Sequence, residues 1–480
     1  MKDTVSLVGA YYSGKSVLVT GATGFMGKVL IEKFLHSCHD VKAIYVCVQN
    51  MLKCKVFDRV REELPNFHEK IKPISAEFTK PNLAISSEDM EEMLSEVNVI
   101  FHCAATVRFD EPLKDALLLN VMGTQQLLRL AHQMKNLEAL IHVSTAYSNC
   151  NRRHIEEVFY PVPVEPKKLL ELVSWMDGSL IEAITPNLIG DWPNTYTFSK
   201  ALTEYLIQQE KGDLNVAIIR PSIVGASWQE PFPGWIDNFN NISGSFVASG
   251  KGILQTVKCN PAALADIIPV DLAINLTIAA GWYTAMHRWG LFIDREIVSV
   301  FYNFAEIHVR NTFEKNPLEK PFRIPNITIT SNYLVHQYWT FVHHTIPAFL
   351  CDLHLRLIGK KPRHLEYFTS HSWDWSSENA NMLMKELNPK DKNVSIFIEA
   401  LHPHGYLKCK LLHTDISASL LSLLCFIRLK TIHCALKATL FVIIWCIFTA
   451  RSKVAQNLWY FLLNLCYKFF SYARHCTLRH

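Results

Sequence analysis

Short apolar runs alternate with amphipathic stretches through the first half of the chain, which is the pattern of strands that alternate with helices. Apolar residues at helical spacing fill the intervals, for example over 120–134 and 194–209. Strands that are apolar at every position are covered on both faces, so the pattern predicts a doubly wound α/β domain with a parallel sheet. The predicted strands cover 17–20, 43–48, 71–74, 98–103, 139–143 and 216–220.

The pattern loosens after about Phe292 and changes again after His404. Several prolines interrupt the middle segment, and its aromatic-rich stretches at 332–341 and 372–387 favour helical pieces. We therefore expect three regions along the chain. They are an α/β domain over 1–290, a smaller and mainly helical domain over 291–404, and an apolar tail over 405–480.

The tail contains one run, 438–450, without a charge between Lys437 and Arg451, and a further apolar run at 458–465. The first run is shorter than the roughly 18 to 20 residues of a comfortable membrane span. Flanking lysine and arginine side chains extend such a segment by reaching toward the interface. We expect a membrane anchor, with a buried or interfacial hairpin as the alternative.

The first predicted strand runs directly into a glycine-rich turn, GATGFMG, at 21–27. Glycines at this spacing allow a sharp turn and let backbone amides approach a pyrophosphate at the N-terminus of the following helix. Such a turn also occurs without a ligand, but here a strand, a helix and a second strand complete a βαβ unit. The sequence predicts a Rossmann-type dinucleotide site. Its expected cofactor contacts are Gly21, Thr23, Gly24, Phe25, Met26 and Gly27.

The end of the second strand indicates which dinucleotide is preferred. An acidic residue there commonly binds the ribose of NAD and would repel a 2′-phosphate, whereas this chain has Gln49 and Asn50 after Val48. The sequence therefore permits NADPH. Lys53, Lys55 or Arg59 are candidates to bind its 2′-phosphate, and the alternative is that they form only a solvated basic surface.

Tyr196 and Lys200 are candidates for the chemistry. A helix over this segment presents both side chains on one face, where the ammonium is expected to stabilise a phenolate. Ser144 and Thr145 follow the fifth strand, and ligands of doubly wound sheets lie at the carboxyl ends of strands. We expect one of these hydroxyls to meet Tyr196 over the cofactor. The alternative is that Ser144 and Thr145 only cap the strand.

Composition excludes several classes. The chain has 480 residues, 49% of them hydrophobic, and a net charge of +4, which is too mild for a nucleic-acid-binding protein. Its 13 cysteines form no CxxC pair, so neither a metal site nor a disulfide framework is expected. The first residues lack the apolar core of a signal peptide, so secretion is not expected.

Several motifs taken together resemble the extended short-chain dehydrogenase/reductases and, more narrowly, the alcohol-forming fatty acyl-CoA reductases of animals. The similarity covers about 14–283, continues in patches through the middle segment and returns at 447–472. The motifs are GATGFMG at 21–27, HCAATVRF at 102–109, Asn120, HVSTAY at 142–147, YTFSK at 196–200 and RPSIVGASWQEPFPGWIDN at 220–238.

The resemblance implies that NADPH reduces a long-chain acyl-CoA twice, through an aldehyde-level intermediate, to a fatty alcohol. It implies that Thr145, rather than Ser144, and Tyr196 bind the carbonyl oxygen. Tyr196 would donate a proton, Lys200 would hold the nicotinamide ribose, and Asn120 would orient Lys200 through a water. The remaining cofactor contacts that it implies are Ala104, Ala105, Pro221 and Val224.

The resemblance also implies a tail anchored in the peroxisomal membrane with the catalytic domain in the cytosol; the endoplasmic reticulum is the alternative. The chain departs from the family at Gln49, where arginine is usual, and over 290–304 and 395–435. Two other readings stay open: an extended reductase or epimerase acting on a sterol or nucleotide sugar, and a non-catalytic membrane-bound paralogue. A homo-oligomer or a pair with a paralogue is a further expectation.

Overall fold

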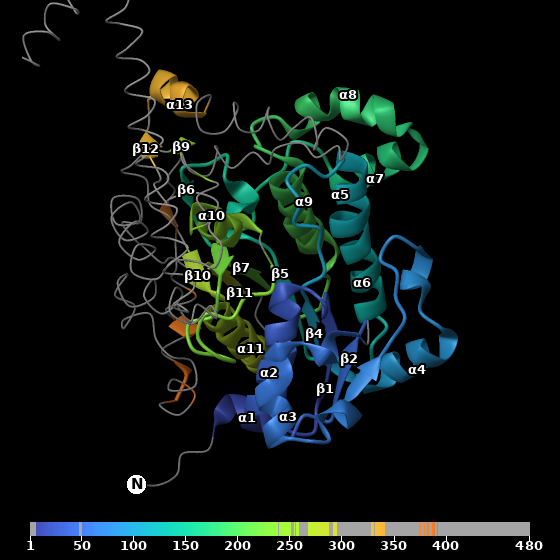
Figure 1. Ribbon diagram of the computed structural model, residues 1–480. Coiled ribbons are helices and arrows are strands. Elements are labelled where there is room, and N and C mark those ends of the chain that lie inside the picture. Colours follow the sequence, from blue (N-terminus) through green and yellow to red (C-terminus); the bar gives the residue numbers. More distant parts are fainter. Residues whose placement is uncertain are drawn as a thin grey trace, which may run out of the picture.

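A seven-stranded parallel sheet forms the centre of the computed structural model (Figure 1). The structure describes residues 6–47, 50–238, 240–250, 254, 256–258, 267–287, 291–294, 328–330, 332–340, 374–375, 379, 382–383, 386–388 and 391. The central strands are β1 Ser16–Thr20, β2 Ala43–Val46, β3 Ile71–Pro73, β4 Val97–His102, β5 Ala139–Val143, β7 Val216–Arg220 and β11 Leu291–Asp294.

Strand order in the sheet is β11-β7-β5-β4-β1-β2-β3, and every pairing is parallel. The order reverses between β1 and β4, so the doubly wound topology predicted from the sequence is confirmed. In such a sheet the reversal point is where ligands bind, outside the carboxyl ends of the strands. Three small parallel pairs accompany the sheet: β8 Ile223–Gly225 with β10 Ile267–Pro269, β9 Thr256–Lys258 with β12 Thr328–Thr330, and β6 His154–Ile155 with β13 Asp374–Trp375.

Helices cover both faces of the sheet (Figure 1). The helices are α1 Leu7–Tyr12, α2 Phe25–Ser37, α3 Asp58–Glu63, α4 Ser87–Glu96, α5 Leu113–Ala116, α6 Gly123–Ala131, α7 Pro166–Trp175, α8 Gly178–Ile189, α9 Thr195–Glu210, α10 Asn241–Gly250, α11 Val270–His287 and α13 Tyr333–Thr340. Single turns lie at Asn50–Lys53, Lys55–Phe57, Phe67–Lys70, Pro81–Ala84 and Ala146–Asn149, and a π-helical segment, Leu117–Met122, joins α5 to α6.

Strand β1 shows how the alternation of side chains builds two cores. Val17 and Val19 pack with Phe34 of α2 in one core, to which α11 also contributes. Leu18 lies in the opposite core, which includes Leu127 of α6 and other residues of α6 and α9. All five β1 residues are buried, as an apolar run covered on both faces requires.

The structure corrects some predicted boundaries. Leu291–Asp294, which the sequence interpretation placed in the helical domain, pairs with β7 and continues the sheet past residue 290. Asp374–Trp375 falls within a predicted helical stretch but pairs with β6, because a partner strand distant in sequence overrides a local pattern. The helix predicted over 120–134 begins earlier, at Leu113, and α6 ends at Ala131.

Helix α13 agrees with the helix predicted at 332–341. Most of the predicted helical domain and the whole tail, 405–480, lie outside the described residues. Within the described part of the chain, none of the helices combines the length and the hydropathy that crossing a bilayer requires.

Candidate active site

The glycine turn after β1 is shaped by close backbone contacts. Gly21 has a φ of +71°, and a Cβ atom there would lie 2.6 Å from the backbone nitrogen of Ala104. A Cβ on Gly27 would lie 2.2 Å from the carbonyl oxygen of Gly21. The amide of Gly24 donates to that same oxygen at 2.9 Å. The turn therefore packs directly against the end of β4 and begins α2 with backbone amides at its tip, as a dinucleotide cradle requires.

The other expected cofactor contacts lie around this turn. Thr23 is exposed, whereas Phe25 and Met26 are partly buried at the first turn of α2. Ala104 and Ala105 follow β4, and the amide of Ala104 donates to the hydroxyl of Thr20 at 3.2 Å. Pro221 follows β7, and Val224 and Met26 both pack against the buried cluster of Ile268, Leu272 and Ala273. The segments that carry these residues follow β1, β4 and β7, on one edge of the sheet.

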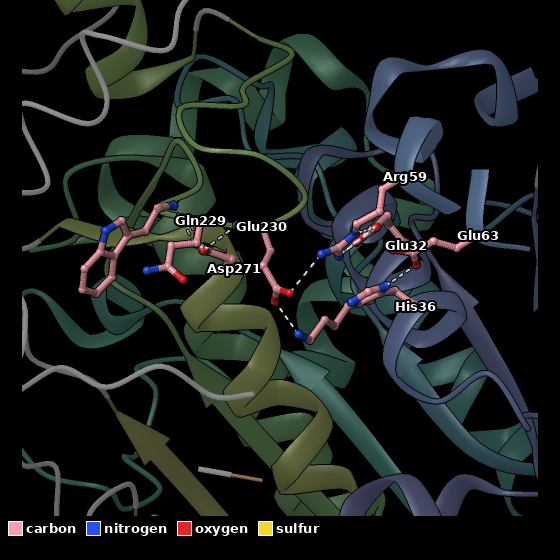
Figure 2. Close-up of polar contacts among 9 residues, drawn as sticks. Glu32, His36, Arg59, Glu63, Gln229, Glu230 and Asp271 are labelled. Carbon is pink, nitrogen blue, oxygen red and sulfur yellow. Dashed lines mark hydrogen bonds and ion pairs between the residues drawn. The ribbon is translucent and has the colours of Figure 1, made fainter. Parts of the chain in front are cut away.

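The loop after β8 lies along α2 and against the glycine turn. The ring of Trp235 stacks on Phe25 with centroids 5.2 Å apart, and Lys28 pairs with Asp237 at 2.6 Å. At the base of this loop the carboxylate of Asp271 accepts backbone amides from residues 228–230 at 2.8 to 3.1 Å (Figure 2). The 220–238 motif thus forms a wall beside the predicted cofactor site.

Tyr196 and Thr145 meet at the carboxyl edge of the sheet. Asn194 caps α9 by accepting the amide of Thr197 at 2.9 Å, which places Tyr196 in the first turn. The side chain of Thr145 acts on the Tyr196 hydroxyl and lowers its pKa, and the Tyr196 ring stacks on Phe109 with centroids 5.8 Å apart. Burial raises the pKa of Tyr196 to about 12 despite the opposing effect of Thr145.

Lys200 is not among the groups that shift the pKa of Tyr196, so its stabilisation of a phenolate stays a prediction. Lys200 is buried, and its Nζ donates to the carbonyl oxygen of Val143 at 2.7 Å. Burial lowers the pKa of Lys200 to about 8, with Glu204 and Cys103 acting in the opposite direction. Tyr196 is therefore a neutral phenol at neutral pH. Such a group is suited to donating a proton.

Ser144 points to a different partner than its neighbour Thr145. Its hydroxyl donates to Oε1 of Glu204 at 2.5 Å and is buried. The expectation that either hydroxyl could meet Tyr196 narrows to Thr145, because successive residues at the end of a strand face different neighbours.

Asn120 lies in the π-helical segment, a form that often occurs at functional sites. Its side chain accepts the amide of Thr106 at 2.9 Å and donates to Ser199 Oγ at 2.9 Å. Its carbonyl oxygen accepts the hydroxyls of Thr124 at 2.6 Å and Thr203 at 3.1 Å. The structure therefore links Asn120 to α9 through the hydroxyl groups of Ser199 and Thr203. The water-mediated link from Asn120 to Lys200 stays a prediction.

Arg59 has partners that remove it from the candidates for the 2′-phosphate (Figure 2). It binds both carboxylate oxygens of Glu32 at 2.9 Å, and its third nitrogen donates to Glu230 at 3.0 Å. Burial raises the pKa of Glu32 to about 7, and Arg59 opposes that shift. Lys53 and Lys55 are exposed on the turns that follow β2. Gln49 lies outside the described residues.

Sequence reasoning missed two residues of this site, Phe109 and Glu204. Phe109 ends the HCAATVRF motif and stacks on Tyr196. Glu204 follows Tyr196 and Lys200 at the same four-residue spacing. That spacing, which places a carboxylate on the face of the helix that carries the other two, was a usable signal.

A parallel doubly wound sheet, a glycine cradle at its reversal point and a tyrosine and lysine on the adjoining helix define a Rossmann-fold oxidoreductase. The family model described as "Male sterility protein" matches residues 19–277. The chain is 50% identical over 502 residues to fatty acyl-CoA reductase 1 of Homo sapiens, a match that covers 97% of this chain and 98% of that protein. It is 48% identical over 508 residues to fatty acyl-CoA reductase 2 of Bos taurus, covering 98% and 99%.

The chain therefore belongs to the fatty acyl-CoA reductase family. Among solved structures it is similar to the terminal R domain from the myxalamid PKS-NRPS biosynthetic pathway. That match has a TM-score of 0.53 and 19% identity, and it covers 85% of this chain and 93% of that domain. This likeness shows a shared fold.

Proposed function

We propose that this protein reduces long-chain fatty acyl-CoA to fatty alcohol, with NADPH as the reductant and an aldehyde-level intermediate. The observation that carries the proposal is the meeting of Tyr196 and Thr145 beside the buried Lys200, at the edge of the sheet where the glycine cradle lies. Identity of 48 to 50% with named fatty acyl-CoA reductases supports acyl-CoA as the substrate class.

The cradle fits a dinucleotide because side chains are excluded from the places where its backbone must come close. Cβ atoms on Gly21 and Gly27 would both lie within 3.0 Å of backbone atoms. The amides at the start of α2 would hold the pyrophosphate, and Lys200 the nicotinamide ribose. Bound NADPH would supply the hydride for each of the two reductions.

The chain's own residues would stabilise the negative charge that develops on the carbonyl oxygen and would donate the proton. The hydroxyls of Thr145 and Tyr196 donate to the carbonyl oxygen as negative charge develops on it. In the first reduction the C–S bond of the thioester breaks and coenzyme A leaves as the thiol. In the second, the aldehyde oxygen takes a proton from Tyr196 and becomes the alcohol. Each turnover consumes two NADPH and two protons.

A panel of substrates tests this function. Purified protein with NADPH is expected to reduce palmitoyl-CoA and to leave a sterol ketone and a nucleotide sugar unchanged. Reduction of either of those two instead would favour another extended reductase. Failure to bind NADPH in a fluorescence titration would favour a non-catalytic paralogue.

We propose that Lys53 and Lys55 provide the charge that favours NADPH over NADH. Both are exposed on the turns that follow β2, on the side of the sheet where a 2′-phosphate is bound in this fold. Replacing both by alanine is expected to weaken NADPH binding by about tenfold or more, since a charged phosphate contact contributes roughly 1.5 to 3 kcal/mol. NADH affinity should stay the same.

Fluorescence titrations with the two dinucleotides measure this difference. Lys80→Ala is the matched control, because Lys80 is an exposed lysine that pairs with Glu77, three residues away, at 3.0 Å. Equal losses of NADPH and NADH affinity in the double variant would show that the two lysines do not bind the 2′-phosphate.

We propose that the tail anchors the protein in the peroxisomal membrane, with the endoplasmic reticulum as the alternative location and the catalytic domain in the cytosol. The uncharged run 438–450 between Lys437 and Arg451 supports a membrane segment with basic residues at its ends. Removal of residues after His404 is expected to release the protein from membrane pellets, whereas alkaline carbonate should leave the full chain bound. Extraction of the full chain by carbonate would contradict an anchor.

A further inference from the structure

We propose that Glu204 is a positioning residue of this reductase site. Its carboxylate fixes the end of β5 that carries Thr145, and its negative charge keeps the neighbouring Lys200 in the ammonium form. This role rests on the reductase function proposed above.

Three consecutive residues at the end of β5 each contact one residue on a single face of α9. Tyr196, Lys200 and Glu204 are four residues apart along the helix, so their side chains lie on one stripe. Thr145 acts on the hydroxyl of Tyr196 and lowers its pKa, the carbonyl oxygen of Val143 accepts from Lys200 at 2.7 Å, and Ser144 donates to Glu204 at 2.5 Å. Glu204 is thus part of the same set of contacts that places Thr145.

Arg220 of β7 holds the Glu204 carboxylate in place. Its guanidinium donates to both carboxylate oxygens, at 3.1 and 2.9 Å. The same guanidinium donates to the carbonyl oxygens of Glu156 at 2.9 Å and Val158 at 2.7 Å. The side chains of Arg220 and Glu204 are 0% and 3% exposed, so the pair is fixed in the interior. A carboxylate held in this way cannot turn away from Lys200.

Among the described groups that act on Lys200, Glu204 is the one that carries negative charge at neutral pH. Burial raises the pKa of the Cys103 thiol to about 12, so this group is neutral. Burial lowers the pKa of His102 to about 3 and that of His142 well below its usual value, so both imidazoles are neutral as well. Tyr196 is a neutral phenol, and Arg220 lies beyond the carboxylate with the opposite sign. Lys200 therefore depends on Glu204 for its counter-charge.

The sign of the effect on activity follows from the charge of Lys200. With its pKa lowered to about 8, the ammonium is lost as pH rises through that value. Removing the charge of Glu204 removes a contribution that raises this pKa, so the ammonium is lost at lower pH. In Glu204→Gln the alkaline limb of kcat/KM against pH is expected to move down by about one pH unit or more. A merely structural role would lower the rate at every pH and leave the limb in place.

The matched control is Glu138→Gln. Glu138 directly precedes β5 at the opposite end and pairs with Lys15 and Tyr11, remote from Lys200. Its substitution should leave the alkaline limb unchanged. The proposal would be overturned if the alkaline limb of kcat/KM stayed in place in folded Glu204→Gln protein. It would also be overturned if the limb moved equally in Glu138→Gln.

Glu204→Gln leaves Arg220 buried without its partner, which can prevent folding. The double variant Glu204→Gln, Arg220→Gln removes both charges, and its alkaline limb should still lie below that of the wild type. Ser144→Ala keeps the ion pair between Glu204 and Arg220, so it should lower kcat without moving the alkaline limb.

If the wild type does not reduce acyl-CoA, the proposed function fails, but the role of Glu204 can still be tested. NADPH titrations across pH would then test the role of Glu204. As pH rises, Glu204→Gln should begin to lose NADPH affinity at a lower pH than the wild type does.

Discussion

Replacing Tyr196 by phenylalanine is expected to lower kcat for alcohol formation by about two to four orders of magnitude, the usual contribution of a positioned proton donor. The substitution removes the hydroxyl on which Thr145 acts and keeps the ring that stacks on Phe109. The fold and NADPH affinity should therefore change little. Single-turnover measurement of alcohol, beside an NADPH titration, separates the two effects.

Tyr205→Phe is the matched control for this variant. Tyr205 lies on the same helix, nine residues further along, and so projects from the opposite side of α9. Its loss should leave turnover near the wild-type value. Alcohol formation at the wild-type rate in Tyr196→Phe would remove this residue from the role of proton donor.

Gly27→Ala is expected to weaken NADPH binding by more than tenfold. The added methyl group would lie 2.2 Å from the Gly21 carbonyl oxygen and 2.8 Å from the Cα atom of Ala22. Both contacts are with backbone, so the turn itself must move. Overpacking of this kind costs about 1 to 3 kcal/mol, and here it displaces the amides that would hold the pyrophosphate.

Gly178→Ala provides the control for the glycine substitution. Gly178 opens α8, and a Cβ atom there meets nothing within 4 Å. This variant should bind NADPH and unfold thermally as the wild type does. If Gly27→Ala protein bound NADPH with unchanged affinity, the turn would not be the cofactor cradle.

The parts of the fold that depend on local pattern could be predicted from the sequence. A continuous apolar run specifies a strand buried on both faces, and the three glycines at 21–27 specify the turn. The spacing of Tyr196 and Lys200 likewise specifies one helix face. These features need no knowledge of which distant segments meet.

The parts that were missed depend on distant partners. Strand β13 forms because it pairs with β6, although the local sequence around it predicts a helix. Arg59 looked like a phosphate-binding residue until the structure placed Glu230, 171 positions away, beside it. Ser144 and Thr145 both offer a hydroxyl after the strand, and the local pattern alone does not show that Ser144 donates to Glu204.

The most direct test of the central claim is isotopic. Purified protein is incubated with palmitoyl-CoA and NADPH that carries deuterium at both C4 positions, and the hexadecanol formed is analysed by mass spectrometry. If NADPH supplies the hydride in both reductions, the alcohol carries two deuterium atoms on its first carbon. Two molecules of NADP⁺ are then formed for each molecule of alcohol. Hexadecanol with fewer than two deuterium atoms on that carbon, or no hexadecanol at all, would contradict the account.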